Sequence, residues 1–209
     1  MTNIAVFASG RGSNFQAVYR KVEEGFIPAR ISLLVTDNSG APCIAFARTH
    51  HIPVRVIRPR DYASPEAFGD ALLRCLQEFG IGFIVLAGYL KKIPANVVEA
   101  YPNRIVNIHP ALLPAFGGKG MYGMKVHEAV FRSGAKVSGV TVHMVNNEYD
   151  AGPIVLQEAV DISDCASPEE IARRVLEREH EVFPRAIKLL LENEVLIDGR
   201  RVTIRKPTE

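Results

Sequence analysis

The chain has 209 residues, of which 47% are apolar and 23% are charged, proportions ordinary for a packed globular protein. A domain of this size buries roughly 70% of its extended-chain surface, so it needs neither a metal ion nor a disulfide in order to fold. The formal net charge of +2 argues against a broad basic surface for nucleic acid, but it leaves room for a local positive pocket that binds a small anion.

Cysteine usage and the N-terminal sequence bear on the compartment. The three cysteines, Cys43, Cys75 and Cys165, are odd in number and form no CxxC pair, so we expect reduced thiols rather than a zinc site or a disulfide framework. The first residues carry no basic leader, and no run reaches the ~18 apolar residues of a membrane span. We therefore expect a cytoplasmic protein, monomeric or homodimeric, that binds neither a membrane nor nucleic acid.

Short apolar, β-branched runs alternate with helical patterns in the first half of the chain. The expected strands are Ile4–Phe7, Ile31–Thr36, Val54–Ile57, Phe83–Leu86 and Ile105–Ile108. The expected helices are Phe15–Glu24, Pro42–His50 and a third that starts at Ser64-Pro65-Glu66 and runs to about Phe79. This alternation predicts an α/β fold, a mostly parallel, Rossmann-like twisted sheet with helices on both faces.

The second half of the chain shows a different order of expected elements. The glycine-rich stretch Ala115–Gly123 is too irregular for an element, so we expect a long loop. The remaining expected elements are a helix at Val126–Ser133, strands at Val137–Val145 and Pro153–Val160, a long helix from Ser167 to Leu191, and a hairpin of Val195–Ile197 with Arg201–Ile204. The long helix opens on a capping box, Ser167-Pro168-Glu169-Glu170. No linker or repeat interrupts the chain, so we expect a single domain over residues 1–209.

A glycine-rich turn, Ser9-Gly10-Arg11-Gly12-Ser13-Asn14, lies between the first expected strand and helix. Its glycines let the backbone approach a ligand, and the helix N-terminus offers N–H groups to an anion. Ser13 and Asn14 are suited to cap the helix and to donate to phosphate oxygens. The segment reads GRGSNF rather than GxGxxG, and Asp37 is near but does not close the second strand in the ribose-binding manner, so a monophosphate site is favoured over a dinucleotide site. A tight turn that holds no ligand is the alternative.

The segment Asn107-Ile108-His109-Pro110 is the most informative one. Side chains two apart on a strand point to the same side, so Asn107 and His109 project together from the carboxyl end of a buried strand, where open α/β sheets place their ligands. An amide donor beside a histidine suits the stabilisation of an oxyanion during acyl transfer. An ordinary pair of hydrogen-bonded strand-end residues is the alternative.

A candidate acid follows downstream in the turn Asp150-Ala151-Gly152-Pro153. A carboxylate beside a histidine raises the pKa of the imidazole and fixes its orientation, so Asp150 near His109 would complete a catalytic group. Aspartate is also common in turns for purely structural reasons, and sequence spacing does not say whether the two side chains meet.

Four motifs in order carry a family resemblance: the loop Ser9–Asn14 (SGRGSN), then Leu86–Ile93 (LAGYLKKI), Asn107–Pro114 (NIHPALLP) and Asp150–Ile154 (DAGPI). Together they resemble the glycinamide ribonucleotide formyltransferases, folate-dependent enzymes of purine synthesis, over nearly the whole chain from Ile4 to about Pro184. The NIHPxLLP and DxGPI motifs are shared with other enzymes that use 10-formyltetrahydrofolate, whereas the GxGSN loop points to the glycinamide ribonucleotide substrate.

The resemblance implies the formyltransferase fold and a role for each matching residue. The implied catalytic residues are Asn107, His109 and Asp150. The implied contacts to glycinamide ribonucleotide are Gly12, Ser13, Asn14 and Glu179. The implied folate contacts are Tyr89, Leu90, Lys91, Lys92 and Ile93 in the pterin pocket, Asn107, and the closing loop of Asn146, Asn147, Glu148, Tyr149 and Asp150. The phosphate-binding half is then 1–100 and the catalytic and folate-binding half 101–209, with Thr141 and His143 supporting the site or, for His143, simply satisfied in the core.

The implied activity is transfer of the formyl group of 10-formyltetrahydrofolate to the amine of glycinamide ribonucleotide, in the synthesis of IMP. It requires no metal, and the sequence offers no ligand cluster of the right spacing. The rivals are a hydrolase of the folate, a formyltransferase for methionyl-tRNA or a sugar nucleotide, and a phosphate-binding module without catalysis. The remaining histidines, His50, His51 and His127, match no motif, and we expect them at the surface or at helix ends.

Overall fold

The computed structural model describes residues 1–206. The chain divides into two compact units, the first ending at Asn107 and the second beginning at Ile108. The expectation of one domain, with halves that meet near residue 100, stays a prediction. No helix in residues 1–206 is both long enough and apolar enough to cross a membrane.

The first unit alternates strands and helices. Its elements are β1 (Thr2–Phe7), α1 (Ser13–Glu23), β2 (Ala29–Thr36), α2 (Cys43–Thr49), β3 (Val54–Val56), the 3₁₀ turn η1 (Pro59–Asp61), α3 (Pro65–Glu78), β4 (Phe83–Leu86), α4 (Ala95–Ala100) and β5 (Ile105–His109), the last of which runs on into the second unit.

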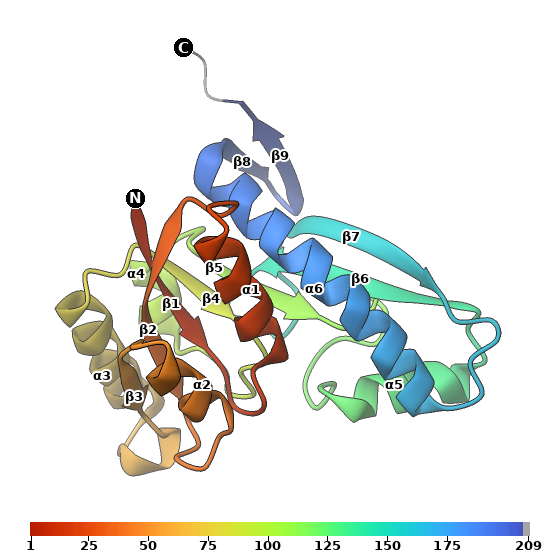
Figure 1. The fold of residues 1–209 in the computed structure, drawn as a ribbon, viewed down its shortest axis with the longest axis horizontal. Coiled ribbons are helices and arrows are strands. Elements are labelled where there is room, and N and C mark those ends of the chain that lie inside the picture. The colour runs from red at the N-terminus through yellow and green to blue at the C-terminus, as the bar shows by residue number, and fades with distance from the viewer. Residues whose placement is uncertain (207–209) are drawn as a thin grey trace. The chain divides into compact units, whose positions relative to one another are not determined.

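The strands of the first unit form a parallel sheet in the order β3-β2-β1-β4-β5. The chain steps from β1 outward to β3 and then returns across β1 to β4 and β5. Crossovers between parallel strands are right-handed in nearly all proteins, so steps in opposite directions put their helices on opposite faces, with α1 and α2 on one face and α3 and α4 on the other. Figure 1 shows this arrangement around β1 and β2.

Burial explains why the strands read as continuous apolar runs. In β1, Ile4 and Val6 point to one face of the sheet and Phe7 to the other, and all three are fully buried. Helices cover both faces, so neither face tolerates polar side chains. Polar residues such as Ser9 and Asp37 follow the carboxyl ends of β1 and β2.

The second unit packs a long helix on an antiparallel pair of strands. Its elements are α5 (Met124–Ser133), β6 (Val137–Met144), β7 (Ile154–Asp161), α6 (Pro168–Glu192), β8 (Glu194–Asp198) and β9 (Arg201–Arg205). Strands β6 and β7 are antiparallel, β8 and β9 form a terminal hairpin, and β9 meets β7 in parallel at Ile154 and Arg201. Helix α6 contacts α5, β6 and β7, and Figure 1 shows it lying along the two strands.

The start of α6 shows why the sequence places a helix there. Ser167 Oγ accepts the N–H of Glu170 at 3.2 Å, and Glu170 Oε2 accepts the N–H of Ala166 at 2.7 Å. Ser167 thus satisfies an N–H group that the first turn leaves without a partner, and Glu170 ties the preceding backbone to the helix. The return bond reaches the residue before the cap rather than the cap itself.

The predicted α/β fold with a mostly parallel sheet is confirmed, and every expected strand and helix is present with ends that agree to within two residues. Two short elements, η1 and α4, were not predicted. The expected capping by Ser13 or Asn14 was wrong, because α1 begins at Ser13 and its N-cap is Gly12, with no side-chain cap.

Candidate functional site

The second unit brings together two of the three predicted catalytic side chains. His109, at the end of β5, is 3% exposed, and its Nδ1 lies 3.6 Å from Oδ2 of Asp150. Asp150 lies in the turn between β6 and β7, so residues 41 positions apart in the sequence meet in space. At 3.6 Å the contact is an ion pair when the imidazole is protonated, and it is longer than a hydrogen bond.

The glycine-rich loop after β5 holds both side chains through its backbone. Nε2 of His109 donates to the carbonyl of Phe116 at 2.9 Å, and the N–H of Gly118 donates to Asp150 Oδ2 at 2.9 Å. A carbonyl only accepts, so Nε2 carries a proton in this arrangement and Nδ1 is the nitrogen that faces Asp150. The loop therefore fixes both the ring orientation and the carboxylate.

The turn that carries Asp150 depends on close backbone contact. Asp150 has φ +52°, a left-handed conformation that aspartate tolerates better than most residues. Two residues later, a Cβ added to Gly152 would overlap the carbonyl of Met144 on β6. Only glycine allows the turn to lie this close to β6, and this places the carboxylate.

A second histidine contacts the same carboxylate. His143 on β6 is 2% exposed, its Nε2 is 3.6 Å from Asp150 Oδ1, and its Nδ1 donates to the carbonyl of Met144 at 2.8 Å. The sequence left His143 open between a supporting role and a satisfied core position. The structure shows a buried, hydrogen-bonded histidine that contacts Asp150, and its role in supporting the site stays a prediction.

The pKa values of His109 and Asp150 both lie below their ordinary values. Burial lowers the pKa of His109, and although Asp150 and the Phe116 carbonyl both raise it, the net shift is downward. The expected net rise was therefore wrong, because desolvation of the imidazolium outweighs the carboxylate. Burial raises the pKa of Asp150, but the contacts with His143, His109 and the Gly118 N–H outweigh burial and hold it below its ordinary value. At neutral pH the structure thus holds a neutral His109 beside an ionised Asp150.

Asn107 precedes His109 by two positions on β5 and is half-buried, in register with Leu86 of β4. Side chains two apart share one side of a strand, so the predicted projection of Asn107 with His109 follows from the observed strand.

The predicted phosphate loop occupies the turn from β1 into α1, within the first unit. Gly12 has φ +75°, and a Cβ at this position would lie 2.7 Å from Cβ of Cys43. The N–H of Cys43, the first residue of α2, donates to the carbonyl of Gly10 at 3.2 Å, so α2 is hydrogen-bonded to the loop. Ser13 and Asn14 lie in the first turn of α1, and the N-terminal end of a helix dipole favours an anion.

The predicted pterin segment follows β4 in the same unit. Tyr89 and Ile93 are buried, whereas Leu90, Lys91 and Lys92 are exposed. Tyr89 packs edge-on against Phe7, with ring centroids 5.2 Å apart. Buried side chains thus anchor the segment at both ends, with three exposed residues between them.

A comparison with protein families decides which family the chain belongs to. The model described as "Formyl transferase" matches residues 2–187, which include every motif described above. The chain belongs to the formyl transferase family.

Individual formyl transferases agree with this placement. Over 197 residues the chain is 45% identical to the chloroplastic phosphoribosylglycinamide formyltransferase of Arabidopsis thaliana, and it is 41% identical to that of Vigna unguiculata. It covers 66% and 62% of the lengths of these two plant proteins. The phosphoribosylglycinamide formyltransferase of Bacillus subtilis is 40% identical, with 91% of this chain and 95% of that protein aligned. The glycinamide ribonucleotide transformylase 1 structure from Symbiobacterium toebii superposes with a TM-score of 0.91 at 39% identity, covering 98% of this chain and 94% of that one.

The other predicted residues of this formyl transferase lie as follows. The closing loop Asn146–Asp150 begins with an Asx turn, in which Asn146 Oδ1 accepts the N–H of Glu148 at 3.0 Å. Asn147, Glu148 and Tyr149 are exposed, so the loop offers side chains to solvent or to a ligand. Glu179 is buried in the middle of α6, at 7% exposure. Their roles toward substrate and folate stay predictions.

One histidine was misplaced by sequence reasoning. His127 is 6% exposed on α5, and burial together with the nearby His109 lowers its pKa to about 4. The expectation of a surface position was wrong, because Val126 and Val130 put the buried stripe of α5 on the same side as residue 127. The residue does lie near a helix end, in the first turn of α5. His50 caps the end of α2 and His51 follows it, as expected.

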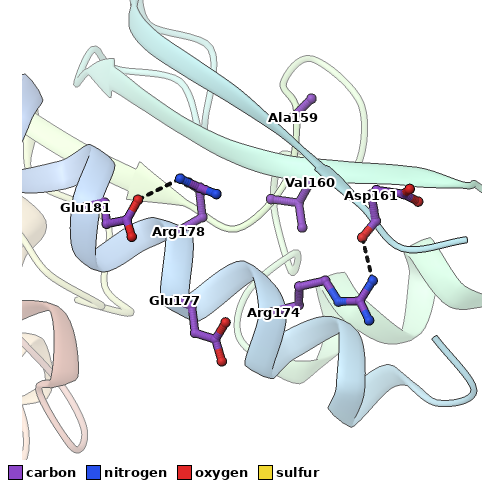
Figure 2. A pocket seen from close by; sticks show the side chains of 7 residues that line it. All are labelled: Ala159, Val160, Asp161, Arg174, Glu177, Arg178 and Glu181. Atoms are coloured by element: carbon purple, nitrogen blue, oxygen red, sulfur yellow. Dashed lines mark hydrogen bonds and ion pairs between the residues drawn. The ribbon is translucent and has the colours of Figure 1, made fainter. Parts of the chain in front are cut away.

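A hollow of about 410 Å³ lies on the second unit between β7 and α6. Figure 2 shows that charged side chains dominate its lining, and that the guanidinium groups of Arg174 and Arg178 bind within the unit rather than pointing free. Arg178 pairs with Glu181 at 2.6 Å, and Arg174 pairs with Asp164 at 2.6 Å. None of the predicted site residues lines it. Within residues 1–206, no group of three or more His, Cys, Asp or Glu side chains is placed to hold a metal ion.

Proposed function

We propose that this protein transfers the formyl group of 10-formyltetrahydrofolate to the amine of glycinamide ribonucleotide, giving formylglycinamide ribonucleotide and tetrahydrofolate in the synthesis of IMP. The observation that carries the proposal is the buried His109–Asp150 pair, which lies 3.6 Å apart in a chain of the formyl transferase family. The names of the plant and bacterial relatives support this choice of substrate.

The reaction needs an attacking amine, a place for negative charge and a route for one proton. The amine nitrogen attacks the formyl carbon and a new C–N bond forms, while the carbonyl electrons move to oxygen. The Asn107 amide donates to that oxygen, and such preorganised donors are worth about 3 kcal/mol of barrier each. Collapse of the tetrahedral intermediate breaks the bond between the carbon and the folate nitrogen.

The proton moves from the attacking amine to the departing folate nitrogen. Asp150 is ionised at neutral pH, because its contacts with His143, His109 and the Gly118 N–H outweigh burial and keep its pKa low, so it is fit to accept that proton directly or through a water. His109 is neutral before the reaction, because burial lowers its pKa. As negative charge develops on the formyl oxygen, the proton that Asp150 accepts from the amine passes to Nδ1 of His109, which faces the carboxylate at 3.6 Å, and the resulting imidazolium stabilises the oxygen by its charge. Collapse of the intermediate returns this proton to the departing folate nitrogen, so no proton is gained or lost.

Binding is divided among the residues of each unit. In the first unit, Gly12, Ser13 and Asn14 hold the phosphate of glycinamide ribonucleotide at the start of α1, and Tyr89 to Ile93 line the pterin. In the second unit, Asn146 to Asp150 close over the folate and Glu179 contacts the glycinamide group. The protein acts in the cytoplasm on these two small molecules, as a monomer or homodimer, and light scattering of the purified protein measures which.

The test is an assay of the purified protein with 10-formyltetrahydrofolate, with and without glycinamide ribonucleotide, in which formylglycinamide ribonucleotide, formate and tetrahydrofolate are measured by mass spectrometry. The proposal requires formylated ribonucleotide and little formate. Formate released equally without the ribonucleotide would identify a folate hydrolase. No turnover, together with retained phosphate binding, would identify a binding module. Faster formyl transfer to methionyl-tRNA than to glycinamide ribonucleotide would show that the tRNA is the substrate.

A further inference from the structure

A buried carboxylate in the first unit is used by none of the steps above. Asp37 follows β2 at the carboxyl end of the sheet, and its side chain is only 10% exposed. Strand β1 lies between β2 and β4 in this sheet, so the segments that leave all three strands emerge side by side at one edge. These segments include the phosphate loop after β1 and the pterin segment after β4.

One hydroxyl connects the three segments. Ser9, the residue directly before Gly10, is 8% exposed, and its Oγ donates to Asp37 Oδ1 at 2.5 Å. The same Oγ accepts the N–H of Leu90 at 2.9 Å. A carboxylate only accepts hydrogen bonds, so the single hydroxyl proton of Ser9 is donated to Asp37. The lone pairs of Ser9 Oγ are then left to accept the N–H of Leu90.

The surrounding contacts make this link rigid on both sides. The N–H of Ser9 donates to the carbonyl of Gly88 at 3.1 Å, and Lys91 Nζ lies 3.5 Å from Asp37 Oδ2. The Lys91 side chain is 47% exposed, so this ion pair is partly screened by solvent and contributes less than the two part-buried hydrogen bonds of Ser9 Oγ. The short side chain of Ser9, held by two hydrogen bonds, therefore transmits a displacement of its own backbone to the backbone of Leu90.

We propose that Asp37 is a positioning residue that, through Ser9, couples the phosphate loop to the Tyr89–Ile93 segment, so that a ligand in one raises the affinity of the other. Ordering of the loop by a phosphate fixes Ser9, and Ser9 fixes the backbone of Leu90, which lies in the segment proposed to line the pterin. The second ligand then has less backbone left to order, which is a positive coupling. The inference rests on the proposed function, because the two ligands are those of that reaction.

Equilibrium binding tests the coupling without turnover. Tetrahydrofolate carries no formyl group, so its Kd is measured by calorimetry with and without saturating glycinamide ribonucleotide. In the parent protein the ribonucleotide tightens tetrahydrofolate binding about fivefold or more, the lower end of ordinary couplings. Ser9→Ala and Asp37→Leu bring that ratio to within about twofold of one. Asp37→Asn, which keeps an acceptor oxygen for Ser9 but loses the charge, retains it.

The matched control is Ser133→Ala in the second unit. Ser133 Oγ also bridges, donating to the carbonyl of Val130 at 2.7 Å and accepting the N–H of Ala135 at 3.3 Å. This variant keeps the parent ratio. A parent ratio of one, or the parent ratio in folded Ser9→Ala or Asp37→Leu, would overturn the coupling while leaving formyl transfer intact. Failure of either ligand to bind, with no formyl transfer, would remove the proposed function and the coupling together.

Discussion

Replacement of Asp150 by asparagine removes one negative charge and little else. Asparagine has the same shape, and it tolerates the left-handed φ of +52° at this position. Its amide oxygen can still accept the N–H of Gly118, which now bonds Asp150 Oδ2 at 2.9 Å. The substitution therefore isolates the charge from the geometry of the turn.

The expected loss follows from the distance between the two groups. An imidazolium and a carboxylate 3.6 Å apart attract by about 4 to 5 kcal/mol at an effective dielectric constant of about 20. Because burial lowers the pKa of His109, the imidazolium forms as the transition state is approached, so most of this attraction acts on the barrier. Asp150→Asn should then lower kcat on the order of a thousandfold.

The assay is steady-state formyl transfer, with kcat and both Michaelis constants measured separately, alongside thermal unfolding of each variant. The matched control is Asp164→Asn, which removes a carboxylate from an exposed pair with Arg174 and should leave kcat unchanged. If Asp150→Asn keeps kcat within about tenfold of the parent, the charge is not used in the transition state and the reasoning from distance and burial is wrong.

Three further outcomes are expected. Asn107→Ala should lower kcat by roughly 10² to 10³ with a smaller change in KM, and an unchanged kcat would remove this donor from the mechanism. Gly12→Ala should raise KM for glycinamide ribonucleotide and lower Tm more than Gly25→Ala, because both have positive φ but only residue 12 would meet Cys43, and equal effects would contradict this. His127 stays neutral in the folded protein to about pH 4 and protonates near 6.5 when unfolded, so its contribution to stability is complete above pH 6.5 and is lost as pH falls toward 4. Between pH 7 and 5 this titration should lower the free energy of unfolding, measured with urea, by about 2 kcal/mol, and the His127→Gln variant should lack this part of the decrease.

Local patterns carried most of the fold prediction. The capping box at Ser167 and the apolar runs of β1, β4 and β5 each mark an element by chemistry that acts within a few residues. Helix α4 was not predicted, because six residues after Pro94 are too few to show a helical period. The cap of α1 was misjudged, because a left-handed Gly12 takes the place that a side-chain cap would fill.

The candidate site was predictable in its members but not in its energetics. The strand-end rule placed Asn107 and His109 on one side of β5, whereas the approach of Asp150 depends on tertiary packing that spacing does not contain. The direction of the His109 pKa shift was missed, because the sequence names the carboxylate but not the depth of burial. The same strand-end rule, applied to β2, would have singled out Asp37.

The close approach of Gly152 to Met144 has a consequence for engineering this turn. The carboxylate of Asp150 reaches its position only because position 152 has no side chain, so aspartate and glycine behave as one inseparable feature together with the strand that faces them. A library randomised over 146–153 should return glycine at 152 in every active clone. Transplanting the acid into another scaffold would require the facing backbone as well as the loop.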